Sequence, residues 1–252
     1  MNNAFSLHNQ TALITGGGTG IGKAIAQCMA EAGAAVLLVG RRQEVLKQAC
    51  KDIGDRAAYL VYDVTCTDNV ETFCRQVYER VGTPDILVHN AGIHLKKEAA
   101  HTTSEEILAV FNTHVFGACA LTRAFMPSFI ERGSGSIVFI TSMAAVFGIP
   151  EVSAYAAAKS SLLGLVRTYA TELSPKGIRV NAVAPGWIQT AMMEHALESD
   201  SQREQRILSR TPLRCFGAPE DIGWAAVYLC SPAARFVTGQ QLVVDGGVSI
   251  GF

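Results

Sequence analysis

Short apolar segments alternate with longer amphipathic segments along most of this 252-residue sequence, and this alternation constrains the fold more than any other feature. The apolar segments are rich in Val, Ile and Leu and nearly continuous in hydrophobicity, which is typical of parallel strands buried on both faces of a sheet. Several segments between them follow a Ser or Thr and end at a Gly, as helices do. The sequence therefore predicts an α/β fold with a doubly wound parallel sheet flanked by helices. The expected strands are residues 11–15, 35–39, 57–62, 85–90, 136–141, 178–183 and 241–245.

This pattern continues without a low-complexity linker, an internal repeat or a change in composition, which indicates a single domain over residues 1–252. The least regular stretch lies near residues 186–217, and we expect a substrate lid at about 188–213. Its polar run ESDSQREQR offers little to a core, whereas Met192 and Met193 offer adaptable apolar contacts. The lid is therefore predicted to be mobile in the free protein and to order over bound ligands.

The charge balance argues against a nucleic-acid or membrane partner. Lys plus Arg number 21 and Asp plus Glu number 22, so the net charge of −1 gives no bulk attraction to polyanions. Seven cysteines without a C-x-x-C pair favour reduced thiols over disulfides or a zinc site, and no metal is expected. The N-terminal residues show no targeting segment, and no apolar run reaches about 18 residues. We expect a cytoplasmic protein with a small-molecule partner.

A glycine-rich turn follows the first expected strand. In TGGGTGIG, Gly16, Gly20 and Gly22 have the spacing G-x-x-x-G-x-G, which differs from the usual dinucleotide spacing G-x-G-x-x-G. Glycines at a strand-to-helix turn let the backbone approach a pyrophosphate and place it at a helix N-terminus. A plain loop is the alternative, but the position between an apolar strand and an amphipathic helix favours a dinucleotide cradle.

The stretch SAYAAAKSS places Tyr155 and Lys159 four positions apart on a strongly helix-forming background. Residues at i and i+4 lie on one face of a helix, so both side chains can act on one ligand. The alternative is an ordinary amphipathic helix with two partly exposed polar residues.

These features together resemble the short-chain dehydrogenase/reductase family, and the resemblance covers nearly the whole chain. It implies a Rossmann fold with a seven-stranded parallel sheet, a nicotinamide cofactor and a homotetramer. The motifs that carry it are TGGGTGIG, Asp63-Val64, Asn90-Ala91-Gly92, Asn112, Ser142, Tyr155, Lys159, Pro185-Gly186 and Thr190.

The resemblance implies that Asn112, Ser142, Tyr155 and Lys159 are the catalytic residues. Lys159 and the positive nicotinamide should lower the pKa of Tyr155, which then acts as acid and base for the substrate hydroxyl. Ser142 would donate a hydrogen bond to the substrate oxygen, and Asn112 would hold a water that leads to the lysine. Taken alone, Ser142 is equally well a strand-end cap and Asn112 a polar residue that faces a neighbouring helix.

The second expected strand ends at Gly40, where enzymes that prefer NAD usually have an acid for the ribose hydroxyl. Arg41 and Arg42 follow and can bind a 2′-phosphate, so NADP(H) is the preferred cofactor, with NAD(H) possible. Two solvated arginines are the alternative. The predicted cofactor-binding residues are Gly16, Gly18, Thr19, Gly20, Ile21, Gly22, Arg41, Arg42, Asp63, Val64, Asn90, Ala91, Gly92, Tyr155, Lys159, Pro185, Gly186, Ile188 and Thr190.

The expected substrate pocket mixes apolar and polar residues. We interpret the chain as an oxidoreductase that transfers hydride between NADP(H) and a secondary alcohol or ketone of a sugar acid or polyol. A 3-oxoacyl thioester reductase and a non-catalytic dinucleotide-sensing or scaffold protein are the alternatives. Lys96 and Lys97 could attract a substrate carboxylate or form a solvated turn, and His89 is expected to be a structural core residue. The predicted substrate contacts are His94, Met143, Phe147, Glu151, Trp187, Met192 and His195.

The homotetramer is also expected from the long helices at about 103–131 and 153–174. They carry apolar residues on more than one face, so a stripe facing the sheet does not account for all of them. The C-terminal segment VVDGGVSIGF is expected to join the same interfaces. The residues that prompt this expectation are Phe111, Val115, Phe116, Leu162, Leu165 and Val166.

Overall fold

Seven parallel strands form one sheet in the computed structural model, which describes residues 4–190, 193 and 201–251. The strand order is β3-β2-β1-β4-β5-β6-β7, and every neighbouring pair is parallel. The predicted doubly wound fold with seven strands is therefore confirmed. The strands are β1 (Thr11–Thr15), β2 (Ala35–Gly40), β3 (Ala57–Val61), β4 (Ile86–His89), β5 (Gly135–Ile140), β6 (Ile178–Pro185) and β7 (Gln241–Val244).

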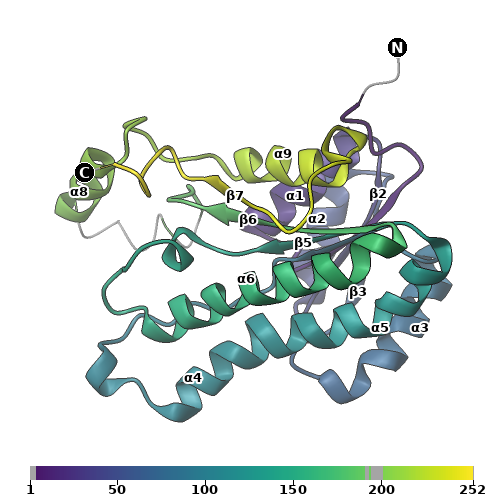
Figure 1. The fold of residues 1–252 in the computed structure, drawn as a ribbon, viewed down its shortest axis with the longest axis horizontal. Coiled ribbons are helices and arrows are strands. Elements are labelled where there is room, and N and C mark those ends of the chain that lie inside the picture. The colour runs from purple at the N-terminus through teal and green to yellow at the C-terminus, as the bar shows by residue number, and fades with distance from the viewer. Residues whose placement is uncertain (1–3, 191–192, 194–200, 252) are drawn as a thin grey trace.

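Helices cover both faces of the sheet (Figure 1). Helices α1, α2 and α9 pack on one face, and α3, α5 and α6 pack on the other. Strand β1 supplies both cores, because Leu13 faces one cluster while Ala12 and Ile14 face the other. The helices are α1 (Gly20–Glu31), α2 (Gln43–Ile53), α3 (Val70–Val81), α4 (Ser104–Phe111), α5 (Gly117–Arg132), α6 (Ser153–Leu173), α8 (Ser201–Arg210) and α9 (Pro219–Cys230). Short 3₁₀ turns lie at Thr67–Asn69, Ala99–His101, Met143–Ala145, Ser174–Lys176 and Pro232–Ala234.

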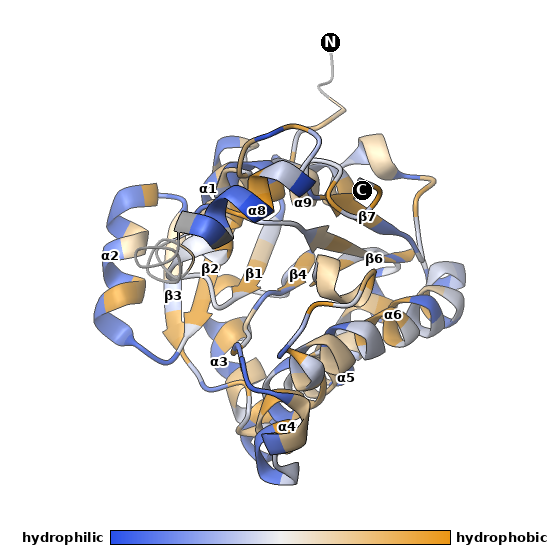
Figure 2. Ribbon diagram, turned by 90° about the vertical axis from the view of Figure 1, so that its left-hand side faces the viewer, coloured by the Kyte–Doolittle hydropathy of each residue, from blue (hydrophilic) through white to orange (hydrophobic). Residues whose placement is uncertain are grey.

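The two edge strands differ from the expectation of burial on both faces. In β3, Val61 is 46% exposed and the other residues are half-buried, and β7 has a similar pattern. An edge strand has a neighbour on one side, so its outer side chains keep contact with solvent. Figure 2 shows hydrophobic residues along β1 and β4 in the sheet and hydrophilic residues along the helix α8.

Helices α4 and α5 continue one another through a π-helical segment, Asn112–Phe116. The expectation that several apolar residues here and on α6 need a partner subunit is wrong for Val115, Leu162 and Val166, which are buried within the chain's own core. Leu108 and Phe116 remain exposed, at 53% and 48%.

The continuous helix over Ser104–Arg132 is 29 residues long and, by length and composition, is apolar enough to cross a membrane. Polar residues interrupt this helix, among them Asn112, His114 and Arg123, so the expectation that no continuous apolar run reaches about 18 residues stands. Its α5 part places Leu121, Phe125 and Phe129 in the core beneath the sheet, where they contact the other core residues of that face. A core helix of a globular fold accounts for the same pattern.

Strand order reverses between β1 and β4, because the chain runs outward to β3 on one side and to β7 on the other. Loops that leave the carboxyl ends of β1 and β4 turn to opposite faces of the sheet and open a crevice. Every sequence motif named above follows a strand's carboxyl end or lies on a helix beside that end. The fold thus brings the motifs to one edge of the sheet.

Candidate active site

A cavity of about 400 Å³ opens at the carboxyl ends of β1, β2, β3 and β4. It brings together most of the predicted cofactor-binding residues, namely Gly16, Gly18, Thr19, Gly20, Ile21, Gly22, Arg41, Arg42, Asp63, Val64, Asn90, Ala91, Gly92 and Thr190. Five predicted cofactor-binding residues do not line this cavity, namely Tyr155, Lys159, Pro185, Gly186 and Ile188. Sequence reasoning missed further lining residues, which are Val45, Leu46, Tyr62, Ile93 and Thr113.

The glycine turn has the geometry that a pyrophosphate cradle requires. Gly16 and Gly20 have positive φ angles of 66° and 50°, and a Cβ on Gly22 would collide with the carbonyl oxygen of Gly16. Helix α1 begins there without an acidic residue in its first turn, and within the described residues Thr19 makes no side-chain cap. The free N–H groups of that first turn therefore face the cavity and suit a bound anion.

A hydrogen-bonded pair, Thr15 and Asn90, ties the ends of β1 and β4 together beneath this turn. The Thr15 hydroxyl donates to the Val88 carbonyl at 3.2 Å and accepts from the Asn90 N–H at 3.0 Å. The Asn90 amide donates to the carbonyls of Thr15 at 3.0 Å and Gly16 at 3.3 Å. The sequence prediction included Asn90 but missed Thr15, whose signal was a polar residue at the end of a buried strand directly before the glycines.

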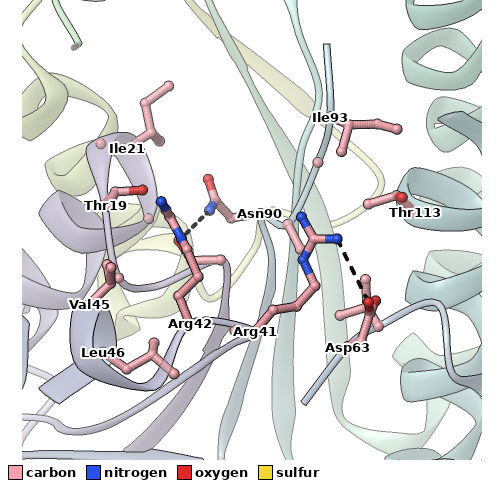
Figure 3. Close-up of a pocket in the computed structure, with 18 of the residues that line it drawn as sticks. Thr19, Ile21, Arg41, Arg42, Val45, Leu46, Asp63, Asn90, Ile93 and Thr113 are labelled. Carbon is pink, nitrogen blue, oxygen red and sulfur yellow. Dashed lines mark hydrogen bonds and ion pairs between the residues drawn. The ribbon is translucent and has the colours of Figure 1, made fainter. Parts of the chain in front are cut away.

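Arg41 and Arg42 line the cavity between the glycine turn and Asp63 (Figure 3). The Asp63 carboxylate accepts from the Thr65 N–H at 2.9 Å and from the Thr65 hydroxyl at 2.8 Å. Arg41 extends toward Asp63, with its Nη1 3.8 Å from Oδ2, and its side chain is 69% exposed. A long, exposed ion pair of this kind contributes little, so Arg41 can turn to a phosphate at small cost.

Tyr155 and Lys159 lie on α6 as the spacing predicted. Lys159 is 4% exposed, and its Nζ donates to the Ile140 carbonyl at 2.6 Å. Its Nζ also lies 5.6 Å from the centre of the Tyr155 ring. Burial lowers the pKa of Lys159 to about 7. Ser142, just after β5, is buried, and its hydroxyl accepts from the Ala144 N–H at 3.1 Å. Ser142 therefore acts as a strand-end cap, and a catalytic role is compatible with this hydrogen bond.

The pKa of Tyr155 is raised, because burial disfavours the phenolate, and a hydrogen bond with the Ser142 hydroxyl offsets part of that effect. The expected lowering of this pKa by Lys159 and the positive nicotinamide together concerns the enzyme with bound cofactor, and it stays a prediction for that state. Lys159 directs its ammonium to the Ile140 carbonyl.

Asn112 opens the π-helical segment, and its carbonyl accepts a hydrogen bond from the Gly117 N–H five residues later. A π-helical turn inside an α-helix is rare and occurs frequently at functional sites. The segment packs against α6, the helix of Tyr155 and Lys159. Asn112 therefore lies on an element that contacts the helix of Tyr155 and Lys159.

The predicted substrate contacts divide into several groups. The His94 ring lies 5.0 Å from the Tyr155 ring, at the site itself. Met143 is buried in the 3₁₀ turn after Ser142, so it presents little surface to a ligand. Phe147 is half-buried, and the Arg210 guanidinium of α8 lies 5.9 Å from its ring centre. Arg210 was missed, because nothing in the local sequence links α8 to the loop after β5.

The remaining contacts are less direct. Trp187 is fixed through its carbonyl, which accepts from the Gly217 N–H at 3.0 Å. Glu151 has a positive φ of 66° and pairs with Lys96 at 3.1 Å. Lys97 pairs with Glu106 at 2.8 Å, so the two lysines form ion pairs rather than a solvated turn. Met192 and His195 lie outside the described residues, as does much of the expected lid.

His89 is a core residue, as expected. It is 5% exposed, its Nε2 lies 2.8 Å from the Thr122 hydroxyl, and its ring lies 4.7 Å from the ring of Phe139. Across the described part of the chain, no group of three or more His, Cys, Asp or Glu side chains is placed to hold a metal.

The glycine cradle at a topological switch point, with a tyrosine and a buried lysine beside it, defines a nicotinamide-dinucleotide-dependent oxidoreductase. Comparison with known proteins agrees. The family described as enoyl-(acyl carrier protein) reductase matches residues 16–249. The chain belongs to the short-chain dehydrogenase/reductase family and acts on CH–OH groups.

Individual relatives span nearly the whole chain. The 3-oxoacyl-acyl-carrier-protein reductase of Thermotoga maritima is 35% identical over 97% of this chain and 99% of its own length. The 2-dehydro-3-deoxy-D-gluconate 5-dehydrogenase of Bacillus subtilis is 35% identical over 98% of this chain and 97% of its own. A solved gluconate 5-dehydrogenase of Burkholderia cenocepacia, in complex with NADP and tartrate, has a TM-score of 0.93 and 32% identity, covering 99% of this chain and 98% of that one.

Proposed function

We propose that this enzyme transfers hydride between NADP(H) and a secondary alcohol or ketone of a small sugar acid or polyol. The observation that carries the substrate class is Arg210, a cation that stacks on Phe147 in the loop between Ser142 and Tyr155. We expect a guanidinium on this loop to bind a substrate carboxylate. The relatives named gluconate dehydrogenases, one of them complexed with the dicarboxylate tartrate, support an acidic substrate.

The nicotinamide supplies the hydride acceptor or donor when it is bound. The glycine turn would hold the pyrophosphate, and Lys159, whose Nζ lies 5.6 Å from the Tyr155 ring centre, would bind the ribose. The Tyr155 hydroxyl takes or gives the proton of the substrate oxygen, and Ser142 donates a hydrogen bond to that oxygen. The two groups hold the carbinol carbon in line for hydride transfer.

A panel of substrates tests this function. Purified enzyme with NADP⁺ or NADPH is assayed against sugar acids, the matching polyols and 3-oxoacyl thioesters, with absorbance of the reduced cofactor as readout. We expect kcat/KM for the best sugar acid to exceed that for any thioester at least tenfold. The second candidate function, 3-oxoacyl thioester reduction, is favoured by the Thermotoga maritima relative and would give the opposite order.

Replacing Arg41 with Ala should chiefly weaken NADP(H). A charge-assisted hydrogen bond to a phosphate is worth about 1.5 to 3 kcal/mol, so we expect the wild type to prefer NADP(H) on the order of tenfold to several hundredfold. The Arg41→Ala variant should lose most of that preference, with kcat/KM for NAD(H) little changed. The measurement is the ratio of kcat/KM for the two cofactors in both proteins.

Gly40 provides a second arm of this cofactor experiment. A Cβ there meets only the Leu46 side chain, at 3.5 Å or more, so Asp can be introduced without a collision. The double variant of Gly40→Asp with Arg41→Ala should prefer NAD(H). A wild type that already favours NAD(H), or a ratio untouched by Arg41→Ala, contradicts the assignment.

Arg210→Gln should raise KM for a sugar acid about tenfold and leave KM for the corresponding polyol within about twofold, because the lost ion pair involves the carboxylate alone. The matched control is Arg206→Gln on the same helix, whose Nε donates to the Gln202 carbonyl at 3.3 Å. Equal effects on acid and polyol would exclude Arg210 as the carboxylate contact.

We also propose a homotetramer. Exposed apolar side chains on α4, the π-helical segment and the C-terminal region support it, namely Leu108, Phe116, Val243 and Ile250. Sedimentation at micromolar concentration should give a species of four chains, and Phe116→Glu should shift it toward smaller species. A monomeric wild type would refute this assembly.

A further inference from the structure

His114 lies between the wall of the dinucleotide cavity and the catalytic tyrosine, and neither the cofactor site nor the proton transfer described above uses it. It belongs to the π-helical segment that Asn112 opens, and it is 4% exposed. A buried histidine that no cofactor or substrate contact explains is a candidate for a role in the site.

The first set of contacts joins His114 to the loop after β4. Its Nε2 lies 2.8 Å from the Ile93 carbonyl oxygen and 3.1 Å from the Ile93 nitrogen. The shorter distance favours a proton on Nε2 that is donated to the carbonyl. A Cβ on Gly92 would collide with the His114 ring, so the imidazole fills the space beside that residue. Gly92 and Ile93 both line the cavity, which means that the ring supports the cavity wall from behind.

The second contact joins His114 to the acid/base residue. Its ring meets the Tyr155 ring edge to face, with 5.5 Å between the centres and an angle of 83° between the planes. Other groups also face the same tyrosine. Lys159 Nζ lies 5.6 Å and the His94 ring 5.0 Å from its ring centre, and the Ser142 hydroxyl forms a hydrogen bond with Tyr155. His114 thus joins Tyr155 to the cavity wall at Ile93.

The imidazole is neutral near neutral pH. Burial, followed by the charge of Lys159, lowers the pKa of His114 to about 3, and His94 acts in the same direction. A neutral ring can hold the geometry of the site without adding a charge that would compete with Lys159 for the phenolate.

We propose that His114 is a positioning residue that sets the distance and angle between the Gly92–Ile93 wall of the cofactor cavity and the Tyr155 ring. The hydrogen bond to Ile93 fixes one side of this arrangement and the edge-to-face contact fixes the other. A misplacement of about 1 Å between reacting groups can cost about a hundredfold in rate. The proposal rests on the acid/base role of Tyr155 in the proposed function.

The experiment compares His114→Leu with His89→Leu. The two histidines form a matched pair, because both are buried, both use Nε2 for a hydrogen bond, and both have an Nδ1 without a partner among residues 4–190, 193 and 201–251. Burial also lowers the pKa of His89 to about 3. His89 contacts Phe139 in the core instead of the tyrosine. Loss of stability should therefore be similar in the two variants, whereas loss of catalysis should not.

We expect His114→Leu to lower kcat about 10- to 100-fold at a temperature where it is fully folded, with the dissociation constant of NADPH changed less than about threefold. The pKa in its pH profile of kcat/KM should rise, because an apolar neighbour disfavours the phenolate further. The side-chain amide of His114→Gln can donate to the Ile93 carbonyl, so the kcat of this variant should be at least fivefold higher than that of His114→Leu. Any alcohol or ketone that the wild type turns over can serve as substrate, so failure of the sugar-acid assignment leaves this test intact.

Three results would overturn the proposal. They are a kcat of His114→Leu within about threefold of wild type, an equal loss of kcat in His89→Leu, and a His114→Gln variant no more active than His114→Leu. If His114→Leu does not fold, the comparison uses His114→Gln and His89→Gln instead. A lowered kcat at unchanged melting temperature in His114→Gln, but not in His89→Gln, supports the proposal. Equal kcat values of the two variants reject it.

Discussion

Tyr155→Phe should lower kcat about 10³-fold or more while NADPH binds within about threefold of its wild-type affinity. The substitution removes the hydroxyl that exchanges a proton with the substrate oxygen and keeps the ring between His94, His114 and Lys159. General acid–base catalysis contributes about 10² to 10⁴ in rate, and the loss should appear in kcat because the proton moves in the transition state. Steady-state kinetics and fluorescence titration of NADPH measure the two quantities separately.

Tyr169→Phe is the control for this prediction. Tyr169 lies on the same helix α6 and is partly buried, but it packs near Phe139 on the core side, 6.4 Å between ring centres. Its variant should keep at least half of the wild-type kcat. If Tyr155→Phe retained a rate within about threefold of wild type, another group would have to be the acid/base.

The sequence predicted the sheet and the cofactor cleft well because both depend on local patterns. A buried parallel strand has a continuous apolar run, and a pyrophosphate turn needs glycine where φ is positive, as at Gly16 and Gly20. These signals are contained within a few residues. The carboxyl ends of parallel strands then gather the loops at one edge without further information.

What the sequence could not predict depends on contacts between distant segments. Thr15 and Asn90 are 75 residues apart, and nothing near either one shows that they bond. Arg210 reaches Phe147 from another element, and Lys96 in the loop after β4 pairs with Glu151 in the loop after β5. Burial at the sheet edges likewise depends on strand order, which the runs of apolar residues do not encode. The raised pKa of Tyr155 follows from the depth of the site, and the sequence gives no measure of that depth.

Lys159→Met should lower kcat/KM about 10²-fold or more and weaken NADPH binding, because in the proposed function one ammonium group serves both the tyrosine and the cofactor. Methionine has a similar length and fits a buried position, so the fold should persist. A matched control is Lys176→Met in the 3₁₀ turn after α6, a lysine far along the chain from Tyr155 and Ser142. Wild-type affinity for NADPH in Lys159→Met would exclude the lysine from the cofactor site.

The same substitution should change how stability depends on pH in the protein without cofactor. Burial lowers the pKa of Lys159 to about 7 in the folded state, against about 10.4 in the unfolded chain. Between these values the unfolded state binds more protons at this site, so the free energy of unfolding of the wild type rises with pH through this window. Below about pH 7 both states carry the charge, and the full cost of burying it remains.

Denaturant unfolding of wild type and Lys159→Met between pH 6 and pH 9 measures this difference. One proton corresponds to about 1.4 kcal/mol per pH unit, so the stability gap between the two proteins should shift by roughly 2 to 3 kcal/mol in favour of wild type from pH 7 to pH 9. Burial raises the pKa of the Cys28 and Cys74 thiols to about 12, but both proteins share those thiols and their contribution cancels in the difference. If the free energy of unfolding changed with pH in the same way in both proteins, Lys159 would keep its ordinary pKa in the folded protein. The ammonium would then be fully charged beside Tyr155 before any cofactor binds.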